Sequence, residues 1–255
     1  MKKPKIAICV PSVGEWISEM AQSLCQLLGN RGDLDAILLT RDAAGIAVSR
    51  NELVDAALKQ GATHVFFVDS DVVLPNQVLQ TMLAYDKDVM SVPYPQRRPP
   101  YNWVGRPVVV NEDGQYPGLT EMEFVGAGCL LVKREVFETI RHPYFFETYW
   151  YPDRSQQEQF LGCMADVFPR LSQGGIIKML QIPEVQEFLA SEFSPVGQFS
   201  EDVNFCKKVI RHGFKVLADY EPARQIVHVG KRFNALTPTM ELSTAPYQIK
   251  GNLDA

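Results

Sequence analysis

Two aspartates separated by one residue are the clearest candidates for chemistry in this chain. Asp69 and Asp71 directly follow the apolar run Val65–Val68, with Ser70 between them. Residues i and i+2 of an extended segment point to the same side, so both carboxylates should project together from the end of a buried strand. Ligands bind at that end of an open α/β sheet, and paired carboxylates there suit a divalent cation carrying a phosphorylated substrate. The alternative is a capping aspartate beside a solvated turn residue. The motif alone does not favour either interpretation.

A second acidic pair, Glu201 and Asp202, follows Ser200. Serine is a favourable N-cap and acids in the first helical turn complement the helix dipole, so a structural role alone explains the pair. The functional interpretation is that one carboxylate faces a cleft and removes a proton from an incoming hydroxyl. A carboxylate held at a helix start is rigid and oriented, as a general base must be.

His228 lies in a predicted strand, just before Gly230, Lys231 and Arg232. A single strand histidine is more commonly a half-buried structural residue. Here, a neutral imidazole could complete the shell of a borderline metal such as manganese, and the two cations could neutralise a diphosphate leaving group. Asp71 is far upstream, so only folding can bring these groups together.

Other positions have two interpretations each. Arg50 and Asn51 are either exposed helix surface or nucleotide contacts. Gly126 and Gly128 either allow close strand packing or let substrate approach the backbone. The flanking prolines and tyrosines make Arg97 and its neighbour Arg98 either a solvated turn or a loop that grips substrate.

The pattern along the chain predicts the elements that must position these residues. Apolar runs closed by Gly, Pro or polar residues predict strands at Lys5–Val10, Leu34–Thr40, Val65–Val68, Asp88–Val92, Phe124–Val132, Phe214–Ala218 and Gln225–Val229. Helical spacing predicts helices at Trp16–Leu28, Ala47–Gln60, from Pro75 onward, Arg134–Ile140 and Ser200–His212. Alternation over the first ninety or so residues favours a βαβ, mainly parallel sheet. Residues 142–199 break the pattern and are predicted to be an irregular or helical insertion.

Composition places the chain among ordinary globular proteins. It has 255 residues, 46% hydrophobic and 22% charged, with a net charge of −5. The acidic balance argues against nucleic acid as the main partner without excluding a local basic cleft. Five cysteines without CxxC spacing argue against a disulfide framework or zinc site and favour a reducing compartment. No long apolar span predicts a transmembrane segment, so we expect a cytoplasmic protein.

Five segments in this order resemble GT-A fold glycosyltransferases, most closely the family 2-like group. They are SRN at 49–51, VDSD at 68–71, VGAGCLLVKREVF at 125–137, SEDVNFCKKVIRHGFKV at 200–216 and VHVG at 227–230. The resemblance implies an α/β fold of GT-A type, Rossmann-like in its nucleotide-binding part, with a mainly parallel central sheet. It implies one catalytic domain over residues 1–255. The donor half would be 1–95, the acceptor half 96–235 with the insertion 142–199, and the tail 236–255.

The resemblance also implies roles for residues. Asp69, Asp71 and His228 would hold a divalent metal, with Mn²⁺ expected before Mg²⁺. Asp202 would be the catalytic base, supported by Glu201. Donor contacts would come from Pro11, Ser12, Arg41, Asp42, Arg50, Asn51, Asp69, Ser70, Lys231 and Arg232. The implied reaction moves a sugar from a UDP- or GDP-sugar to an acceptor hydroxyl. Inverting direct displacement with Asp202 as base is the first expectation, and a retaining outcome stays open. The acceptor, whether a glycan, a lipid-linked sugar or another hydroxyl, stays open, as does the oligomeric state.

Two other classes compete with this hypothesis. A haloacid-dehalogenase-like phosphatase also places DxD after a buried strand and uses the first aspartate, here Asp69, as nucleophile. That motif normally lies on the first strand, whereas about sixty residues precede it here. The third candidate is a non-catalytic module that binds sugar or nucleotide. The presence of Asp69, Asp71, Asp202 and His228 together argues against it.

Overall fold

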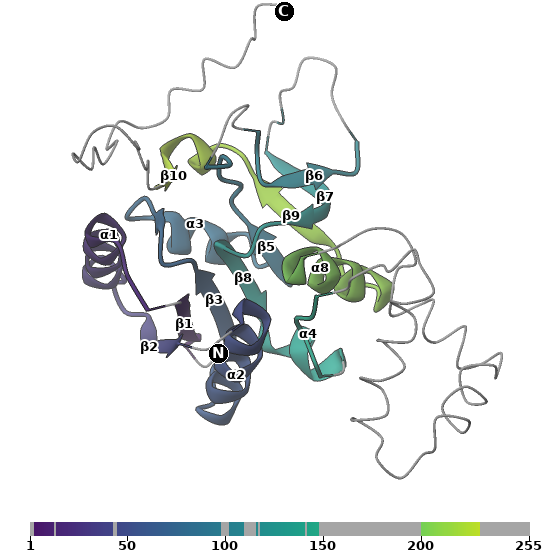
Figure 1. Cartoon of the computed structure of the whole chain (residues 1–255), viewed down its shortest axis with the longest axis horizontal. Helices are drawn as coiled ribbons and strands as arrows, with labels where there is room; N and C mark the ends of the chain where they lie inside the picture. The colour runs from purple at the N-terminus through teal and green to yellow at the C-terminus, as the bar shows by residue number, and fades with distance from the viewer. Residues whose placement is uncertain are drawn as a thin grey trace, which may run out of the picture.

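A mixed central sheet with helices on both faces forms the core of this protein. The computed structural model describes residues 3–12, 14–42, 45–97, 102–109, 116, 118–140, 142–147 and 200–229. The strands are β1 Lys5–Ser12, β2 Asp35–Asp42, β3 His64–Val68, β4 Val72–Val73, β5 Val89–Ser91, β6 Gly105–Pro107, β7 Leu119–Val125, β8 Cys129–Lys133, β9 Val216–Asp219 and β10 Val227–His228. The α-helices are α1 Ser18–Gly29, α2 Ile46–Lys59, α3 Val78–Ala84, α4 Arg134–Thr139 and α8 Glu201–Arg211, and Pro222–Gln225 form a 3₁₀ turn (Figure 1).

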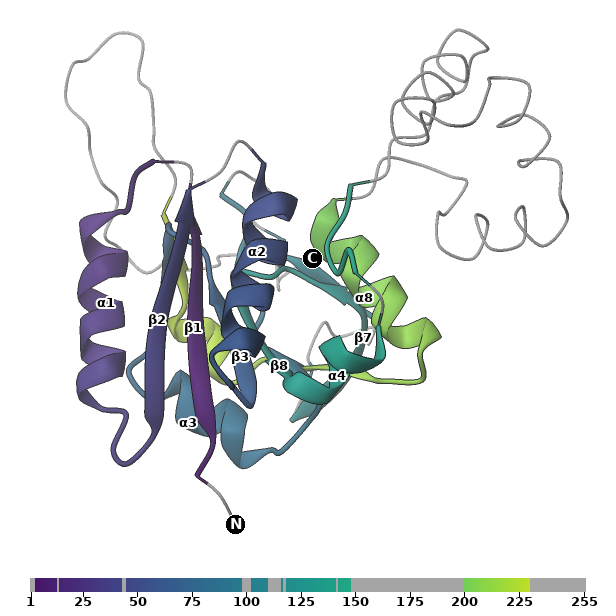
Figure 2. The same cartoon turned by 90° about the horizontal axis from the view of Figure 1, so that it is seen from below.

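Alternating apolar side chains along the strands supply a hydrophobic core on each face of the sheet. In β1, Ile6 and Ile8 pack with α1 and α3, whereas Ala7 and Cys9 pack with the buried face of α2. Figure 2 shows α1 and α2 on opposite sides of β1 and β2. Because both faces are covered, the central strands read as continuous apolar runs in the sequence.

The sheet is mixed, because β7 and β8 run against the other strands, which share one direction. Its eight strands lie in the order β2-β1-β3-β8-β5-β9-β7-β6. The pairs β1–β2, β1–β3 and β5–β9 are parallel, whereas β8 runs antiparallel to both of its neighbours and β7 to both of its own. The βαβ pattern of the first ninety residues predicts the direction of the strands in that segment only. The two reversed strands, β7 and β8, come later in the chain.

The predicted strand Phe124–Val132 is in fact two strands. Gly126, Ala127 and Gly128 separate β7 from β8, which lie on opposite sides of the β5–β9 pair. β8 enters between β3 and β5, so strands from the predicted donor half and acceptor half interleave in one sheet. No strand was predicted at β4 or β6, whereas the remaining strands and α-helices lie within a few residues of their predicted positions.

Some predictions fall on residues outside those described. Of the insertion predicted at 142–199, the structure describes only 142–147, and the tail 236–255 also lies outside the described residues. Among the described residues, no helix combines the length and apolar character needed to cross a membrane. The mixed α/β class is confirmed, with a large central sheet between two layers of helices.

Candidate active site

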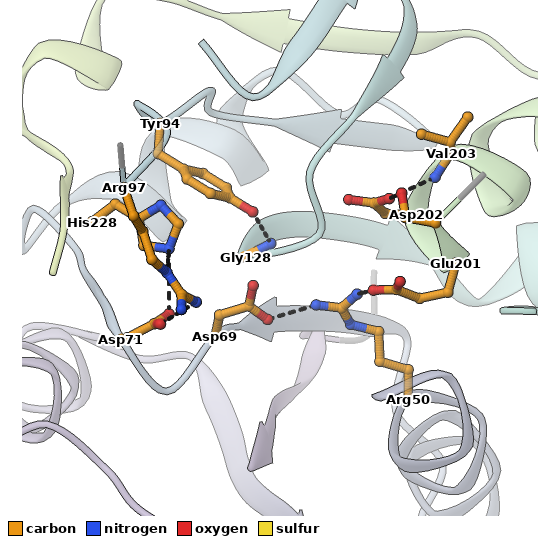
Figure 3. Close-up of polar contacts among 11 residues, drawn as sticks. Arg50, Asp69, Asp71, Tyr94, Arg97, Gly128, Glu201, Asp202, Val203 and His228 are labelled. Carbon is orange, nitrogen blue, oxygen red and sulfur yellow. Dashed lines mark hydrogen bonds and ion pairs between the residues drawn. The ribbon is translucent and has the colours of Figure 1, made fainter. Parts of the chain in front are cut away.

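The candidate residues gather at one edge of the sheet, where β1, β2, β3, β5 and β9 end. These strands run in the same direction, so their carboxyl ends meet at the same edge. Asp69 and Asp71 leave β3 there, α8 brings Glu201 and Asp202, and β10 brings His228 (Figure 3). The short strand β10 reaches this edge by pairing with β4, in which His228 lies opposite Val72.

Arg50 links the two acidic motifs. Its side chain on α2 is only 3% exposed, and its Nη2 donates to Asp69 Oδ1 at 2.6 Å while its Nη1 pairs with Glu201 Oε1 (Figure 3). Burial opposes the charge of Arg50, but Asp69 and Glu201 outweigh it, so the pKa of the guanidinium is raised and it stays cationic. Burial raises the pKa of Glu201 more than Arg50 lowers it. Arg50 therefore joins the end of β3 to the start of α8.

Gly128 packs against both Asp69 and Tyr94. The Asp69 amide donates to the Gly128 carbonyl at 3.2 Å, and the Gly128 amide donates to the Tyr94 hydroxyl oxygen at 3.0 Å. A Cβ on Gly128 would lie 2.8 Å from Asp69 Oδ2 and 2.7 Å from the Tyr94 hydroxyl, so no side chain fits. Burial raises the pKa of Tyr94, and the nearby Asp69 raises it further. Tyr94 therefore stays a neutral phenol.

Asp71 and His228 form a separate pair with Arg97. His228 Nε2 lies 3.5 Å from Asp71 Oδ1, and Arg97 Nε lies 2.7 Å from the same Nε2. The Arg97 guanidinium also pairs with Asp71 Oδ2. Backbone contacts fix the pair, since the Val229 amide donates to the Asp71 carbonyl at 2.9 Å. Asp71 and His228 are far apart in the sequence, and the fold brings their side chains together.

Asp202 lies half-buried in the first turn of α8. Its Oδ1 accepts from the Val203 amide at 2.8 Å and from the Ser200 hydroxyl. Ser200 is the N-cap residue, but its side chain makes no cap hydrogen bond, so its role differs from the predicted one. In Figure 3 the Asp202 carboxylate points toward the side on which Tyr94 lies, and its charge contributes to the raised pKa of Tyr94. Both contacts of Asp202 in the described part of the chain orient Oδ1.

The remaining predicted donor residues have different surroundings. Pro11 and Ser12 lie buried at the end of β1, opposite Arg41 and Asp42 at the exposed end of β2. Arg41 pairs with Glu52 on α2. The Ser70 carbonyl accepts from the Ile17 amide at 3.2 Å.

Asn51 has a structural use that its sequence context did not indicate. Its Nδ2 donates to the Phe145 carbonyl at 2.7 Å, and its Oδ1 accepts from the Tyr144 and Phe145 amides at 2.9 and 3.0 Å. With its amide engaged in this way, Asn51 holds the 142–147 segment against α2. The donor contact of Asn51 stays a prediction. Lys231 and Arg232 lie outside the described residues.

The predicted metal ligands are only partly together. Asp71 and His228 face each other, but Asp69 is turned to Arg50, and the described residues contain no group of three or more His, Cys, Asp or Glu arranged around one metal position. Asp71 Oδ1 is buried without a hydrogen-bond partner among the described residues. Such an oxygen beside an imidazole nitrogen fits a cation that takes its other ligands from substrate phosphates and water.

The sequence did not predict that Arg50 would link Asp69 to Glu201, nor that Tyr94 would lie beside Asp69. Arg50 was a candidate donor contact, and the burial that makes it a link between motifs depends on α8, about 150 residues away. Tyr94 lies in a Pro-rich loop. In the sequence, only Gly126 and Gly128 indicate its position, because a side chain at either glycine would overlap Tyr94.

Comparison with known proteins gives a family match over part of the chain and matches to solved structures. The family model Anp1 matches residues 32–102, which include Arg50, Asp69, Asp71, Tyr94 and Arg97. The crystal structure of A197 from STIV is similar over 85% of this chain and 82% of that chain, with 17% identity and a TM-score of 0.48. None of the curated proteins matches the chain.

Proposed function

We propose that this protein is a GT-A type glycosyltransferase that moves a sugar from a UDP- or GDP-sugar to an acceptor hydroxyl. The observation that carries the proposal is the convergence of Asp69, Asp71, Asp202 and His228 at one sheet edge from three separate parts of the chain. The Anp1 match supports the coarse class, since that family is associated with mannosyltransferase activity.

The donor would lie at the ends of β1 and β3. Asp71 and His228 would hold a divalent cation, Mn²⁺ or Mg²⁺, which supplies positive charge for the departing diphosphate when bound. Asp69, fixed by Arg50, would accept hydrogen bonds from the donor. Lys231 and Arg232 remain predicted partners of the diphosphate. Pro11, Ser12, Arg41, Asp42 and Ser70 remain predicted donor contacts at the same edge.

The transfer itself would be a direct displacement with inversion. Asp202 would take the proton of the acceptor hydroxyl as that oxygen forms a bond to the anomeric carbon. The bond between the anomeric carbon and the diphosphate oxygen breaks, and the diphosphate leaves with the electron pair. With Oδ1 held by Val203 and Ser200, Oδ2 would be the oxygen that receives the proton.

The contacts of Asp69 favour this function over phosphatase chemistry. A phosphatase of the haloacid-dehalogenase type needs the first aspartate as a free nucleophile, whereas Asp69 Oδ1 is paired with a buried arginine. Two strands of the sheet, β1 and β2, also precede the motif in the chain.

A thermal-shift panel of UDP- and GDP-sugars, with and without Mn²⁺, tests the proposal. A ligand at about 100 times its Kd stabilises the folded state by about 2.7 kcal/mol, which is a readily measured change in Tm. We expect one nucleotide sugar to raise Tm in the presence of Mn²⁺ and to lose this effect in Asp71→Asn. Stabilisation by simple phosphomonoesters, together with release of phosphate from them, would instead establish a phosphatase.

Replacing the base separates catalysis from binding. We expect Asp202→Asn to lower the rate of nucleoside diphosphate release from the identified donor by about 10²–10⁴, because a general base contributes that much. The thermal shift caused by the donor should be unchanged. An undiminished rate in Asp202→Asn would remove Asp202 from the mechanism.

A further inference from the structure

The hydrogen bonds of His228 fix its tautomer. Nδ1 lies 2.9 Å from the Pro95 carbonyl oxygen, which can only accept, so Nδ1 carries the proton. Nε2 receives the N–H of Arg97 Nε at 2.7 Å, so it presents a lone pair. An imidazole held by a backbone carbonyl through Nδ1, with the Nε2 lone pair directed outward, has the arrangement of a metal-ligating histidine.

Asp71 supplies the second donor at the same place. Its Oδ1 is buried, has no hydrogen-bond partner among the described residues and lies 3.5 Å from His228 Nε2. A carboxylate oxygen and an imidazole lone pair thus face one position from two strands, β10 and the end of β3. These are the ligand types that suit a divalent metal of intermediate softness.

The guanidinium of Arg97 already stands at this position. It donates to His228 Nε2 and pairs with Asp71 Oδ2, so it occupies the imidazole lone pair and the second oxygen of the carboxylate whose Oδ1 faces the same position (Figure 3). Two cations sharing these donors would repel each other at close range, and the imidazole lone pair can serve only one of them. The guanidinium of Arg97 therefore occupies the position that a bound metal ion would take.

Arg97 can leave without unfolding its loop. Its side chain is 52% exposed, so rotation toward solvent needs no opening of the core. The backbone around it is anchored independently, because the Gln96 amide donates to the Asn102 carbonyl and the Val104 amide to the Tyr94 carbonyl, both at 2.8 Å.

We propose that Arg97 and a divalent cation exclude each other between Asp71 and His228, so that Arg97 sets the affinity of this site for metal. The proposal rests on the proposed function only in taking a divalent cation as the ligand of this pair. Arg97 is a positioning residue here: it holds the two ligands in place without metal and must swing out when metal binds.

Titration of the full chain with Mn²⁺ alone, read from the electron paramagnetic resonance of free Mn²⁺, tests the proposal without any sugar nucleotide. We expect Arg97→Met to bind Mn²⁺ about tenfold more tightly than wild type, the scale expected for removing a competing charge-assisted contact. Arg97→Lys keeps a competing cation but cannot contact both partners as the guanidinium does, so its Mn²⁺ affinity should lie between those of wild type and Arg97→Met. Arg106→Met removes another exposed arginine, which pairs with Glu123 on β7, and it should leave Mn²⁺ affinity unchanged.

The outcomes separate this proposal from the proposed function. Equal Mn²⁺ affinity in wild type and Arg97→Met overturns the exclusion, and so does tighter binding that survives addition of Asp71→Asn. If neither protein binds Mn²⁺, both the exclusion and the metal dependence fall. A metal-independent rise of Tm with one nucleotide sugar would in that case leave the transferase assignment standing.

Discussion

At the scale of single residues, Arg50 decides how two of the candidate carboxylates are held. It is buried between Asp69 and Glu201, which belong to motifs more than 130 residues apart in the chain. The resemblance to glycosyltransferases implies that Glu201 supports Asp202 as the catalytic base. In the structure, Glu201 is tied through Arg50 to Asp69, so it connects the predicted donor and base sides of the site.

Loss of this guanidinium should destabilise the protein. Arg50→Met leaves Asp69 and Glu201 without their counter-ion, and breaking a buried ion pair costs about 3–5 kcal/mol. We expect a loss near the lower end of that range because the Asp69 side chain is 22% exposed. Urea unfolding measures it. Adding Glu201→Gln to Arg50→Met should recover part of the loss, whereas additive losses would show that the two residues do not interact.

The pH dependence of stability should report Glu201. Burial raises its pKa above the ordinary value of 4.5, so the folded state binds this proton more tightly than the unfolded chain does. Its contribution to stability is then fully present below pH 4.5 and is lost as pH rises through the raised pKa. Glu201→Gln lacks this titration. The free energy of unfolding of wild type minus that of Glu201→Gln should therefore fall with increasing pH, and a difference that rises would contradict the assignment.

At the scale of elements, the junction between β7 and β8 packs against Asp69 and Tyr94. Gly126, Ala127 and Gly128 lie between the two strands, and the tight packing of both glycines against Tyr94 leaves no space for a Cβ. The apolar run indicated a strand, and the glycines indicated close packing. The break itself follows from β5 and β9, which lie between β7 and β8 in the sheet.

A single methyl group at this junction should disturb the donor side of the site. The Cβ of Gly128→Ala would displace the Asp69 carboxylate or the Tyr94 hydroxyl, and such overpacking costs about 1–3 kcal/mol. We expect donor affinity, measured by calorimetry, to fall by about tenfold, which corresponds to about 1.4 kcal/mol. Gly29→Ala, at the exposed end of α1 where a Cβ meets nothing within 4 Å, is the matched control. Equal affinities in the two variants would remove Gly128 from the site.

At the scale of the whole molecule, the site exists because distant segments share one sheet edge. Asp71 follows β3, whereas His228 lies on β10, and the pairing of β10 with β4 brings them together. Neither motif carries this information by itself. The spacing between them in the sequence is set by everything that folds in between.

If these two residues form one site, their effects should not add. Asp71→Asn and His228→Gln should each abolish the Mn²⁺-dependent part of the Tm increase caused by the donor, and the double variant should lose no more than either alone. Differential scanning fluorimetry with and without Mn²⁺ measures this. Independent, additive losses would mean that the two residues act at separate places.

The sequence by itself determined the local elements and the chemistry available at their ends. Apolar runs and helical spacing located the central strands and helices, and the acidic residues directly after β3 and at the start of α8 were visible as candidates, because these are local patterns of period 2 and 3.6. Only the tertiary structure decided which groups meet. Strand direction, the insertion of β8 between β3 and β5, the burial of Arg50 and the position of Arg97 between Asp71 and His228 all depend on contacts between segments far apart in the chain. No local pattern encodes such contacts.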